Sequence, residues 1–376
     1  MSQSSGAIRI LHCYSRFGAG DPAPIAVEVM NALGKAAQHT VVSANPDQTS
    51  ARALMDKRVR ASFPTDFPSL TGRSTPGRLV GLARALEGFD LILTYDWGAI
   101  DVAMAHTIFG QSFGLAPLVH HESGLHETAE EKARASRHWY RRAALWRTNG
   151  LVVRGASMEK EALERWKQPR ERITCIPFAL DTQRIEQPNP AGLRVVKREG
   201  EQWIGTFAAP ESTENIVNLV EALKSQPEAW HLVIIGEDCD AGAVRSAATE
   251  HSVDDRVHLA GPVNEGSRVL GLFDVFAVTS DRDPHPILQA MAYALPIVAP
   301  DTGDNATIIA RENRDFVTPP GDVEAIAHSL GALAGDAEGR AEIGAANKAK
   351  ARAQFDNRAS IERHRALYSS VLGRDI

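Results

Sequence analysis

The sequence is poor in cysteine, in long apolar runs and in excess positive charge. Its three cysteines lie far apart among 376 residues, which excludes a disulfide framework and predicts buried, reduced thiols. No run approaches the ~20 apolar residues of a membrane span, and the first residues, MSQSSGAIRI, lack the basic start and apolar core of a signal peptide. The net charge of −6 argues against a nucleic-acid partner. We therefore expect a cytoplasmic globular protein.

The chain is long enough for two domains, and 43% of its residues are hydrophobic, which gives ample core. Short apolar runs alternate with segments of helical spacing, so we predict an α/β protein with parallel sheets covered by helices on both faces. A polar stretch rich in proline and glycine marks the domain boundary. The predicted parts are a first domain over 1–180, a linker over 181–201, a second domain over 202–355 and a terminal helix over 356–376.

One stretch, residues 274–303, predicts a strand, a loop, a helix and a second strand. Apolar runs cover residues 275–278 and 296–299, and apolar residues recur at helical spacing between them. Because the strands of a β-α-β unit are parallel, the loop after the first strand faces a ligand crevice. This loop holds Asp281, Asp283 and His285, and the helix N-terminus that follows predicts an anion or hydroxyl site.

The same stretch resembles a known family. Pro284, Ala290-Met291-Ala292 and the following Pro-Ile-Val-Ala are similar to the donor-site signature of family 4 retaining glycosyltransferases. The resemblance extends over nearly the whole chain. It implies the GT-B fold, in which two Rossmann-like parallel-sheet domains face each other across a cleft and the last helix crosses back to the first domain. It also implies sugar transfer from a nucleotide-sugar donor to a polysaccharide or lipid-linked glycan, with retention of configuration and with no cofactor or metal.

The acidic positions of that signature are altered. The family has two Glu separated by seven residues; the first falls on Asp281 or, with a two-residue gap, on Asp283, and the second falls on Gln289. The resemblance makes the two aspartates catalytic candidates and assigns Gln289 and His285 to the donor. Glutamine keeps one acceptor oxygen for the donor's ribose but loses the charge of the glutamate.

Positions expected to bind the donor diphosphate are altered as well. In the family an Arg and a Lys follow the strand that corresponds to residues 203–207, and here those positions fall near Glu211 and Glu214. Each close like-charge contact with a diphosphate would cost about 1–4 kcal/mol. Loop amides and the helix N-terminus near Pro286 would then have to stabilise the leaving group. Gly205 and Gly236, at two strands of this domain, complete the predicted donor site.

The first predicted strand is followed by a loop that contains Gly18, Gly20 and Asp21. Residues 18–23 match the pattern G-x-G-x-x-A, and Ala23 is its last position. A dinucleotide site is the alternative that this pattern raises, but the second strand ends without an acidic residue for a ribose. In the resembling family this loop approaches the acceptor and often reads Gly-Gly-x-Glu. We therefore assign Gly18, Gly20 and Asp21 to the acceptor, although the glutamate is replaced by Ala23.

A polar cluster ends the predicted strand 117–122: His120, His121, Glu122, His126 and Glu127. The histidines at 121 and 126 are five residues apart, whereas a helical H-E-x-x-H zinc motif needs four, so the spacing disfavours metal. The resemblance places a histidine near the reacting sugar, which makes His121 the first candidate and His120, near the acceptor, the second. A histidine that only bonds locally at a strand end is the alternative.

A basic segment with interleaved aromatic residues, 130–147, predicts a long helix. Such a helix can lie on an anionic membrane at the inner face, which would suit a lipid-linked acceptor. The alternative, which is more common, is a solvated helix with its Trp and Tyr residues in the core. We also expect the last helix, 357–372, to bury Ile361, Leu367, Tyr368 and Leu372 against the first domain.

The departures from the family gather at ligand-facing positions: Asp21, Ala23, Phe178, Glu211, Glu214, Gln289 and Ala294. The strands remain apolar, so random drift does not account for this grouping. Two hypotheses follow. One is a working glycosyltransferase, and the other is a catalytically degenerate GT-B protein that binds a glycan or a partner glycosyltransferase.

Overall fold

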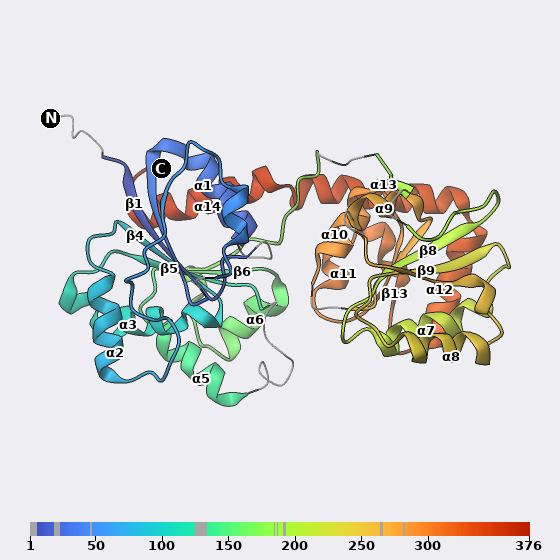
Figure 1. Ribbon diagram of the computed structural model, residues 1–376, viewed down its shortest axis with the longest axis horizontal. Coiled ribbons are helices and arrows are strands. Elements are labelled where there is room, and N and C mark those ends of the chain that lie inside the picture. Colours follow the sequence, from blue (N-terminus) through green and yellow to red (C-terminus); the bar gives the residue numbers. More distant parts are fainter. Residues whose placement is uncertain are drawn as a thin grey trace. The chain divides into compact units, whose positions relative to one another are not determined.

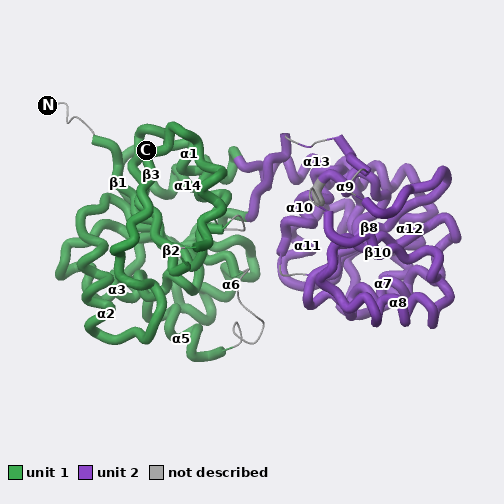
Figure 2. The backbone as a smooth tube through the Cα atoms, in the orientation of Figure 1, with its two compact units in different colours: residues 1–177, 358–376 green, residues 178–357 purple. Residues whose placement is uncertain are grey.

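The computed structural model describes residues 6–18, 23–45, 47–124, 134–183, 185, 187–190, 193–263, 266–280 and 283–376. The chain forms two compact units, shown in different colours in Figure 2. Unit 1 comprises Met1–Pro177 and Arg358–Ile376, and unit 2 comprises Phe178–Asn357. The segment expected as a linker, 181–201, falls within unit 2.

Unit 1 is built on a seven-stranded sheet in the order β3-β2-β1-β4-β5-β6-β7, with every neighbouring pair parallel. The strands are β1 Ile8–Tyr14, β2 Ala37–Ser43, β3 Arg60–Ser62, β4 Leu91–Tyr95, β5 Leu118–Glu122, β6 Gly150–Val153 and β7 Ile173–Cys175. The central strands are buried along their length, because helices cover both faces of a parallel sheet. The strand order reverses between β1 and β4, which is where such sheets open a crevice.

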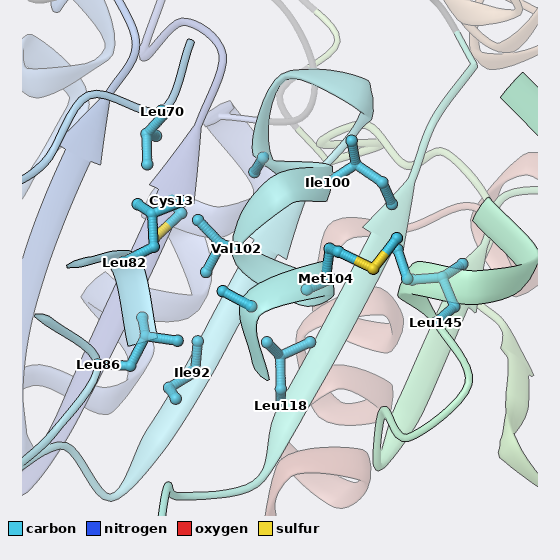
Figure 3. Packing of buried hydrophobic residues seen from close by; sticks show 14 of the residues in the cluster. Cys13, Leu70, Leu82, Leu86, Ile92, Ile100, Val102, Met104, Leu118 and Leu145 are labelled. Carbon is cyan, nitrogen blue, oxygen red and sulfur yellow. The ribbon is translucent and has the colours of Figure 1, made fainter. Parts of the chain in front are cut away.

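The helices of unit 1 divide between the two faces of the sheet (Figure 1). The α-helices are α1 Ala23–Leu33, α2 Pro76–Ala85, α3 Ile100–Phe113, α5 Ala135–Ala144, α6 Ala156–Glu164 and α14 Asn357–Leu372, with short 3-10 turns η1 Gly34–Ala36, η2 Ser50–Leu54, η3 Trp97–Ala99 and η4 Arg170–Arg172. Helices α2, α3, α5 and α6 enclose one apolar cluster, part of which Figure 3 shows, with Cys13, Leu82 and Met104 among its members. Helices α1 and α14 enclose the other.

The last helix, α14, packs on unit 1, as predicted. Tyr368 is buried in the same apolar cluster as β1 and α1, and Ile361, Leu367 and Leu372 pack against it. The tyrosine hydroxyl also lies 2.8 Å from Nε2 of His121 on β5. Apolar packing and a buried hydrogen bond therefore fix the end of the chain to the sheet with which the chain begins.

Unit 2 repeats the architecture with a six-stranded parallel sheet in the order β10-β9-β8-β11-β12-β13. Its strands are β8 Gln202–Phe207, β9 Trp230–Ile235, β10 Val257–Gly261, β11 Val275–Ala277, β12 Ile297–Pro300 and β13 Val317–Thr318. Its helices are α7 Thr213–Leu223, α8 Ala241–Glu250, α9 Gly266–Val269, α10 His285–Ala292, α11 Asn305–Ile308, α12 Val323–Gly335 and α13 Ala337–Gln354, with turns η6 Asp254–Arg256, η7 Leu270–Leu272 and η8 Arg311–Phe316. The strand order reverses between β8 and β11.

Two apolar clusters flank this second sheet. Helices α9, α10 and α13 enclose one, and α7, α8 and α12 enclose the other. The apolar residues expected on one face of α10, Ile287, Leu288 and Met291, are all buried. The predicted order of strand, loop, helix and strand over residues 274–303 is therefore correct.

Two sequence-based expectations are wrong in the structure. Of the three thiols expected to be buried, only that of Cys13 is; Cys175 is exposed and Cys239 is partly buried. The basic segment 130–147 was expected to place its tryptophans in the core if it formed an ordinary solvated helix. The described helix, α5, is shorter, residues 130–133 lie outside the described residues, and Trp139 and Trp146 are 69% and 60% exposed. The residue that this helix buries instead is Arg141, which pairs with Glu122 at the end of β5.

Candidate functional site

A cavity of about 340 Å³ lies where the strand order of unit 2 reverses, at the carboxyl ends of β8 and β11. Ligands of open parallel sheets bind at this point, because the loops that follow two neighbouring strands diverge there. The cavity is lined by Thr206, Phe207, Ala208, Ala209, Pro210, Glu211, Phe276, Val278, Thr279, Ser280, Asp283, Pro286 and Ile287. Most of these side chains are apolar, and the polar ones gather on the two loops.

Hydrogen bonds between the two loops hold the floor of the cavity. The hydroxyls of Thr206 and Thr279 are 3.1 Å apart, and that of Thr279 also donates to the carbonyl of Phe207 at 3.0 Å. The amide of Asn215 on α7 donates to the carbonyl of Thr279 at 2.9 Å. These bonds join β8, β11 and α7, so the cavity is largely formed before a ligand arrives.

Asp283 lies at the cavity, while the other acidic candidate, Asp281, lies outside the described residues. Oδ1 of Asp283 accepts hydrogen bonds from the backbone N–H of His285 at 3.0 Å and from its ring Nδ1 at 2.6 Å. Partial burial raises the pKa of Asp283, but these contacts with His285 outweigh it and lower the pKa below its usual value. Asp283 is therefore a carboxylate at neutral pH. The ring of His285 packs edge-on against Phe178.

The helix N-terminus predicted as an anion site already holds a carboxylate of the protein. In the first turn of α10 the N–H of His285 donates to Asp283, Pro286 has no N–H, and the N–H of Leu288 donates to the carbonyl of Pro284. A bound anion would meet the charge of Asp283 before it reached the helix end. The expectation that this terminus stabilises a diphosphate therefore finds little support in the geometry.

The two glutamates that replace the family's cations differ in position. Glu211 lines the cavity and accepts a hydrogen bond from the hydroxyl of Ser280. Glu214 is in the first turn of α7 and is not among the residues that line the cavity. Among the described residues that line the cavity there is no lysine or arginine, so its fixed charges, Glu211 and Asp283, are both negative.

Three further donor-site candidates are not among the residues that line the cavity. A Cβ added at Gly205 would lie 2.0 Å from the ring of Phe273, so this glycine lets β8 pack against that ring. Gly236 has φ +110°, and a Cβ there would lie 3.3 Å from Cβ of Ala208, which lines the cavity. Gln289 is half-buried on α10 and does not line the cavity.

The acceptor-side candidates are on unit 1, and only some of them can be placed. Gly20, Asp21, His126 and Glu127 lie outside the described residues. Gly18 is described, and among the described residues only the hydroxyl of Ser50 would come within 4 Å of an added Cβ. The assignment of this loop to an acceptor stays a prediction.

His121 lies inside unit 1, on the face of the sheet that α14 covers. Its Nε2 is 2.8 Å from the hydroxyl of Tyr368, its Nδ1 is 3.3 Å from the carbonyl of Thr94, and its ring stacks on Tyr95. Burial and the neighbouring His364 lower its pKa well below the usual value, so the ring is neutral. Both ring nitrogens have partners within the protein, and this geometry corresponds to the alternative of a locally bonded histidine.

His120 points to the opposite face of the sheet, as expected for neighbouring strand residues. Its Nδ1 is 2.8 Å from the hydroxyl of Thr94, and its Nε2 is 3.5 Å from Glu122. Glu122 pairs with Arg141 at 2.8 Å, and the guanidinium of Arg141 lies over the rings of Trp97 and Trp166. This buried group of side chains fixes α5 to the end of β5.

A residue with an unusual backbone conformation that the sequence patterns missed is Asp96, directly after β4. It has φ 54° and ψ −173°, a region that side chains other than glycine rarely adopt, and its carboxylate accepts bonds from the N–H and hydroxyl of Ser123 at 2.6 and 2.9 Å. Nearby, a Cβ added at Gly98 would lie 2.3 Å from Cβ of Ser15. Among the described residues, those that directly follow β1, β4 and β5 therefore pack closely at the reversal point of the unit 1 sheet.

Two absences hold for the described part of the chain. No three side chains of His, Cys, Asp or Glu converge there in a way that could hold a metal ion. Within the same residues, no helix is long and apolar enough to cross a membrane.

The part of the chain that carries the cavity matches a known family. Residues 202–336 match the family model described as Glycosyl transferases group 1. No curated protein matches the chain.

Solved structures resemble the chain over nearly its whole length. That of Anabaena Alr3699/HepE in complex with UDP has a TM-score of 0.74 at 18% identity and covers 96% of this chain and 100% of its own. A glycosyltransferase from Rickettsia africae has a TM-score of 0.76 at 13% identity, covering 97% and 99%. Sucrose-phosphate synthase from Thermosynechococcus elongatus has a TM-score of 0.73 at 18% identity, covering 97% and 99%.

These likenesses confirm the predicted fold. At identities below 20% these similarities show the fold alone. They agree with the two parallel sheets and with the helix α14 that returns to unit 1. The chain therefore has the GT-B fold, and its residues 202–336 are similar to the group 1 glycosyltransferases.

Proposed function

We propose that the protein transfers a sugar from a nucleotide-sugar to a polysaccharide or lipid-linked glycan, with retention of configuration and without a metal. The observation that carries the proposal is the cavity between the ends of β8 and β11. It lies within residues 202–336, the part of the chain that matches the group 1 glycosyltransferase model. UDP is the first nucleotide to test, because the complexes of Anabaena Alr3699/HepE contain UDP, UDP with glucose, or UDP-glucose.

The cavity offers chemistry that suits the sugar end of such a donor. Transfer with retention passes through a transition state in which positive charge develops on the sugar ring. The carboxylate of Asp283, ionised and held by His285, would stabilise that charge from a fixed position. In this proposal Asp283, together with Asp281, faces the sugar, Gln289 serves the ribose and Gly205 and Gly236 shape the walls.

One observation favours the second candidate, a degenerate protein that binds a glycan or a partner glycosyltransferase. Glu211 stands at the cavity where a diphosphate would need a cation, and Asp283 occupies the N-terminus of α10. Each close contact between like charges costs about 1–4 kcal/mol, which is a large share of a micromolar affinity.

A thermal-shift series with UDP, GDP, ADP and their sugar conjugates separates the candidates. A ligand at a hundredfold excess over its Kd adds about 2.7 kcal/mol to the free energy of unfolding, which shifts the melting temperature by a few degrees. A shift with one nucleotide, followed by NMR of the product's anomeric proton, would test transfer and retention together. If no nucleotide shifts the transition, the degenerate candidate replaces the enzyme.

A matched pair of glutamate variants tests the charge argument. Glu211→Lys removes a negative charge from the cavity and adds a positive one, so nucleotide affinity should rise about tenfold or more. Glu214→Lys makes the same change on α7, away from the lining, and should leave the affinity nearly unchanged. Equal effects of the two variants in calorimetric titrations would contradict this placement of the diphosphate.

A further inference from the structure

Exposed apolar side chains gather at one place on unit 1. The large hydrophobic residues exposed among the described residues are Leu54, Ile108, Trp139, Trp146 and Val196. Three of these five, Ile108 and the two tryptophans, line a single open groove of about 520 Å³. Single exposed hydrophobic residues are ordinary on protein surfaces, whereas a contiguous group of this kind marks an interaction site.

The groove runs between α3 and α5. The residues that line it recur at helical spacing, so each belongs to one face of its helical segment. From the α5 side come Trp139, Arg142, Ala143 and Trp146, which recur at i, i+3, i+4 and i+7. From α3 come Met104, Thr107 and Ile108 at the matching spacing. We call these seven residues the α3–α5 surface. A core-facing helix would turn its tryptophans inward, whereas Trp139 on α5 and Trp146, two residues after its end, are both exposed.

The charge around the α3–α5 surface has the opposite sign to that of the chain. The chain carries a net charge of −6, yet residues 134–149 contain five arginines, of which only Arg141 is buried against a glutamate, and no aspartate or glutamate. Arg142 lines the groove, and Arg134 and Arg147 are exposed on the same segment of the chain. On α3, residues 102–113 contain no carboxylate, lysine or arginine. The surface is therefore complementary to a negatively charged partner.

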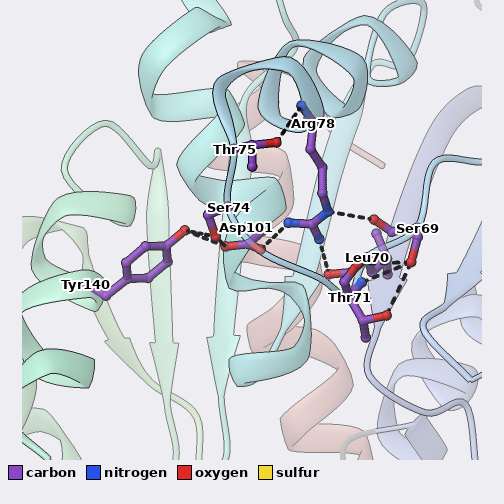
Figure 4. Close-up of polar contacts among 8 residues, drawn as sticks. All are labelled: Ser69, Leu70, Thr71, Ser74, Thr75, Arg78, Asp101 and Tyr140. Carbon is purple, nitrogen blue, oxygen red and sulfur yellow. Dashed lines mark hydrogen bonds and ion pairs between the residues drawn. The ribbon is translucent and has the colours of Figure 1, made fainter.

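Contacts beneath the α3–α5 surface hold it rigid. Figure 4 shows the hydroxyl of Tyr140 on α5 bonded to Asp101 on α3, which in turn pairs with Arg78 on α2. Burial and Asp101 raise the pKa of Tyr140 to about 12, so its hydroxyl remains a donor at neutral pH. At the far end, Arg172 donates to the carbonyl of Trp146 at 2.7 Å. These contacts fix the segment that carries the two exposed tryptophans, Trp139 and Trp146, to the rest of unit 1.

We propose that the α3–α5 surface docks on an anionic lipid bilayer. Tryptophan prefers the headgroup boundary of a membrane, where its ring is buried and its N–H is wet, and arginine binds lipid phosphate. Trp139 and Trp146 insert at that boundary, and Arg142 and Arg147 contact the phosphates. Stable peripheral binding needs two signals, and the surface supplies an apolar one and a cationic one. This inference does not depend on the proposed donor chemistry.

Vesicle cosedimentation tests the docking without any nucleotide. The purified full-length chain should sediment with vesicles of phosphatidylglycerol and phosphatidylcholine and should not with phosphatidylcholine alone. Trp139→Ala combined with Trp146→Ala should abolish most of the binding at low salt. Arg142→Gln and Arg147→Gln should each weaken it about fivefold and reduce its dependence on salt.

Two control variants carry the same chemical changes elsewhere. Arg245→Gln changes an exposed arginine on α8, and Val196→Ser removes the most exposed apolar side chain; both should bind vesicles as the parent does. Circular dichroism confirms that each variant is folded. The proposal is overturned if anionic vesicles bind no protein or if the tryptophan variant binds them fully. It is also overturned if the tryptophan variant instead abolishes self-association, measured by sedimentation without lipid.

Discussion

The buried pair of Glu122 and Arg141 allows a prediction with a distinctive dependence on pH. Both side chains are about 1% exposed, and Nε of Arg141 lies 2.8 Å from Oε2 of Glu122. Burial alone would raise the pKa of Glu122, but Arg141 and His120 outweigh it and lower the pKa from 4.5 to about 2. A lowering of this size corresponds to about 3 kcal/mol in the free energy of unfolding at neutral pH.

The sign follows from the lowered value. The stabilisation is fully present above pH 4.5, where the unfolded-state carboxyl is also ionised, and it is lost as the pH falls toward 2. Arg141→Met leaves a buried carboxylate without its cation, which should cost about 3–5 kcal/mol at pH 7. Without Arg141, burial raises the pKa of Glu122, so this variant should become more stable as the pH falls from 7 to 5, a range in which the contribution of this site is constant in the parent.

Urea unfolding followed by tryptophan fluorescence measures this, because Trp97 and Trp166 lie within about 5 Å of the Arg141 guanidinium. Glu122→Gln is the matched control, since it removes the titrating group and should flatten the contribution of this site to the pH profile. The double variant should cost less than the sum of the single changes, because each single change leaves the partner without its opposite charge. A loss below about 1 kcal/mol for Arg141→Met, or the parent's pH slope in that variant, would refute the reasoning.

Three further predictions concern single positions. Ala294 has φ +60°, a conformation that costs an alanine about 1 kcal/mol, so Ala294→Gly should raise the melting temperature of the chain in calorimetry. Asn347 accepts from the N–H of Ala310 and donates to the carbonyl of Leu295 within the core of unit 2, so Asn347→Ala should lower the free energy of unfolding by about 2–4 kcal/mol, measured in urea. Tyr368→Phe removes the hydroxyl bonded to His121 and should cost about 1 kcal/mol, while Tyr368→Ala, which also loses the packing of the ring, should cost about 3 kcal/mol or more. Unchanged unfolding midpoints would contradict each of these in turn.

Most of the fold is predictable because apolar runs and helical spacing are local properties of the sequence. Most strands of both sheets and the returning helix α14 follow from them, whereas the short edge strands β3 and β13 were not predicted. The face of the sheet toward which a side chain of a buried strand points, in contrast, cannot be predicted from neighbouring residues alone. Both faces of β5 are covered by helices, so apolar patterning does not say whether His120 or His121 faces α14.

The orientation of α5 shows the same limit more strongly. Its inward and outward faces both contain arginine, and only the partner decides which arginine is buried. That partner, Glu122, is nineteen residues earlier on another element. The cavity of unit 2 was predictable in place, from the strand and loop around Asp283, but the position of Glu211 at its lining and of Glu214 away from it depends on the turn before α7.

The path of the chain through the two units has a consequence for its synthesis. Unit 2 is one continuous segment, Phe178–Asn357, whereas unit 1 is assembled from Met1–Pro177 and Arg358–Ile376. On a ribosome, unit 2 can therefore complete its fold while unit 1 still lacks the helix that covers Tyr95 and His121. One apolar face of unit 1 stays uncovered until residues 358–376 emerge, so loss of this segment would expose the part of the unit that is synthesised first to chaperones and proteases.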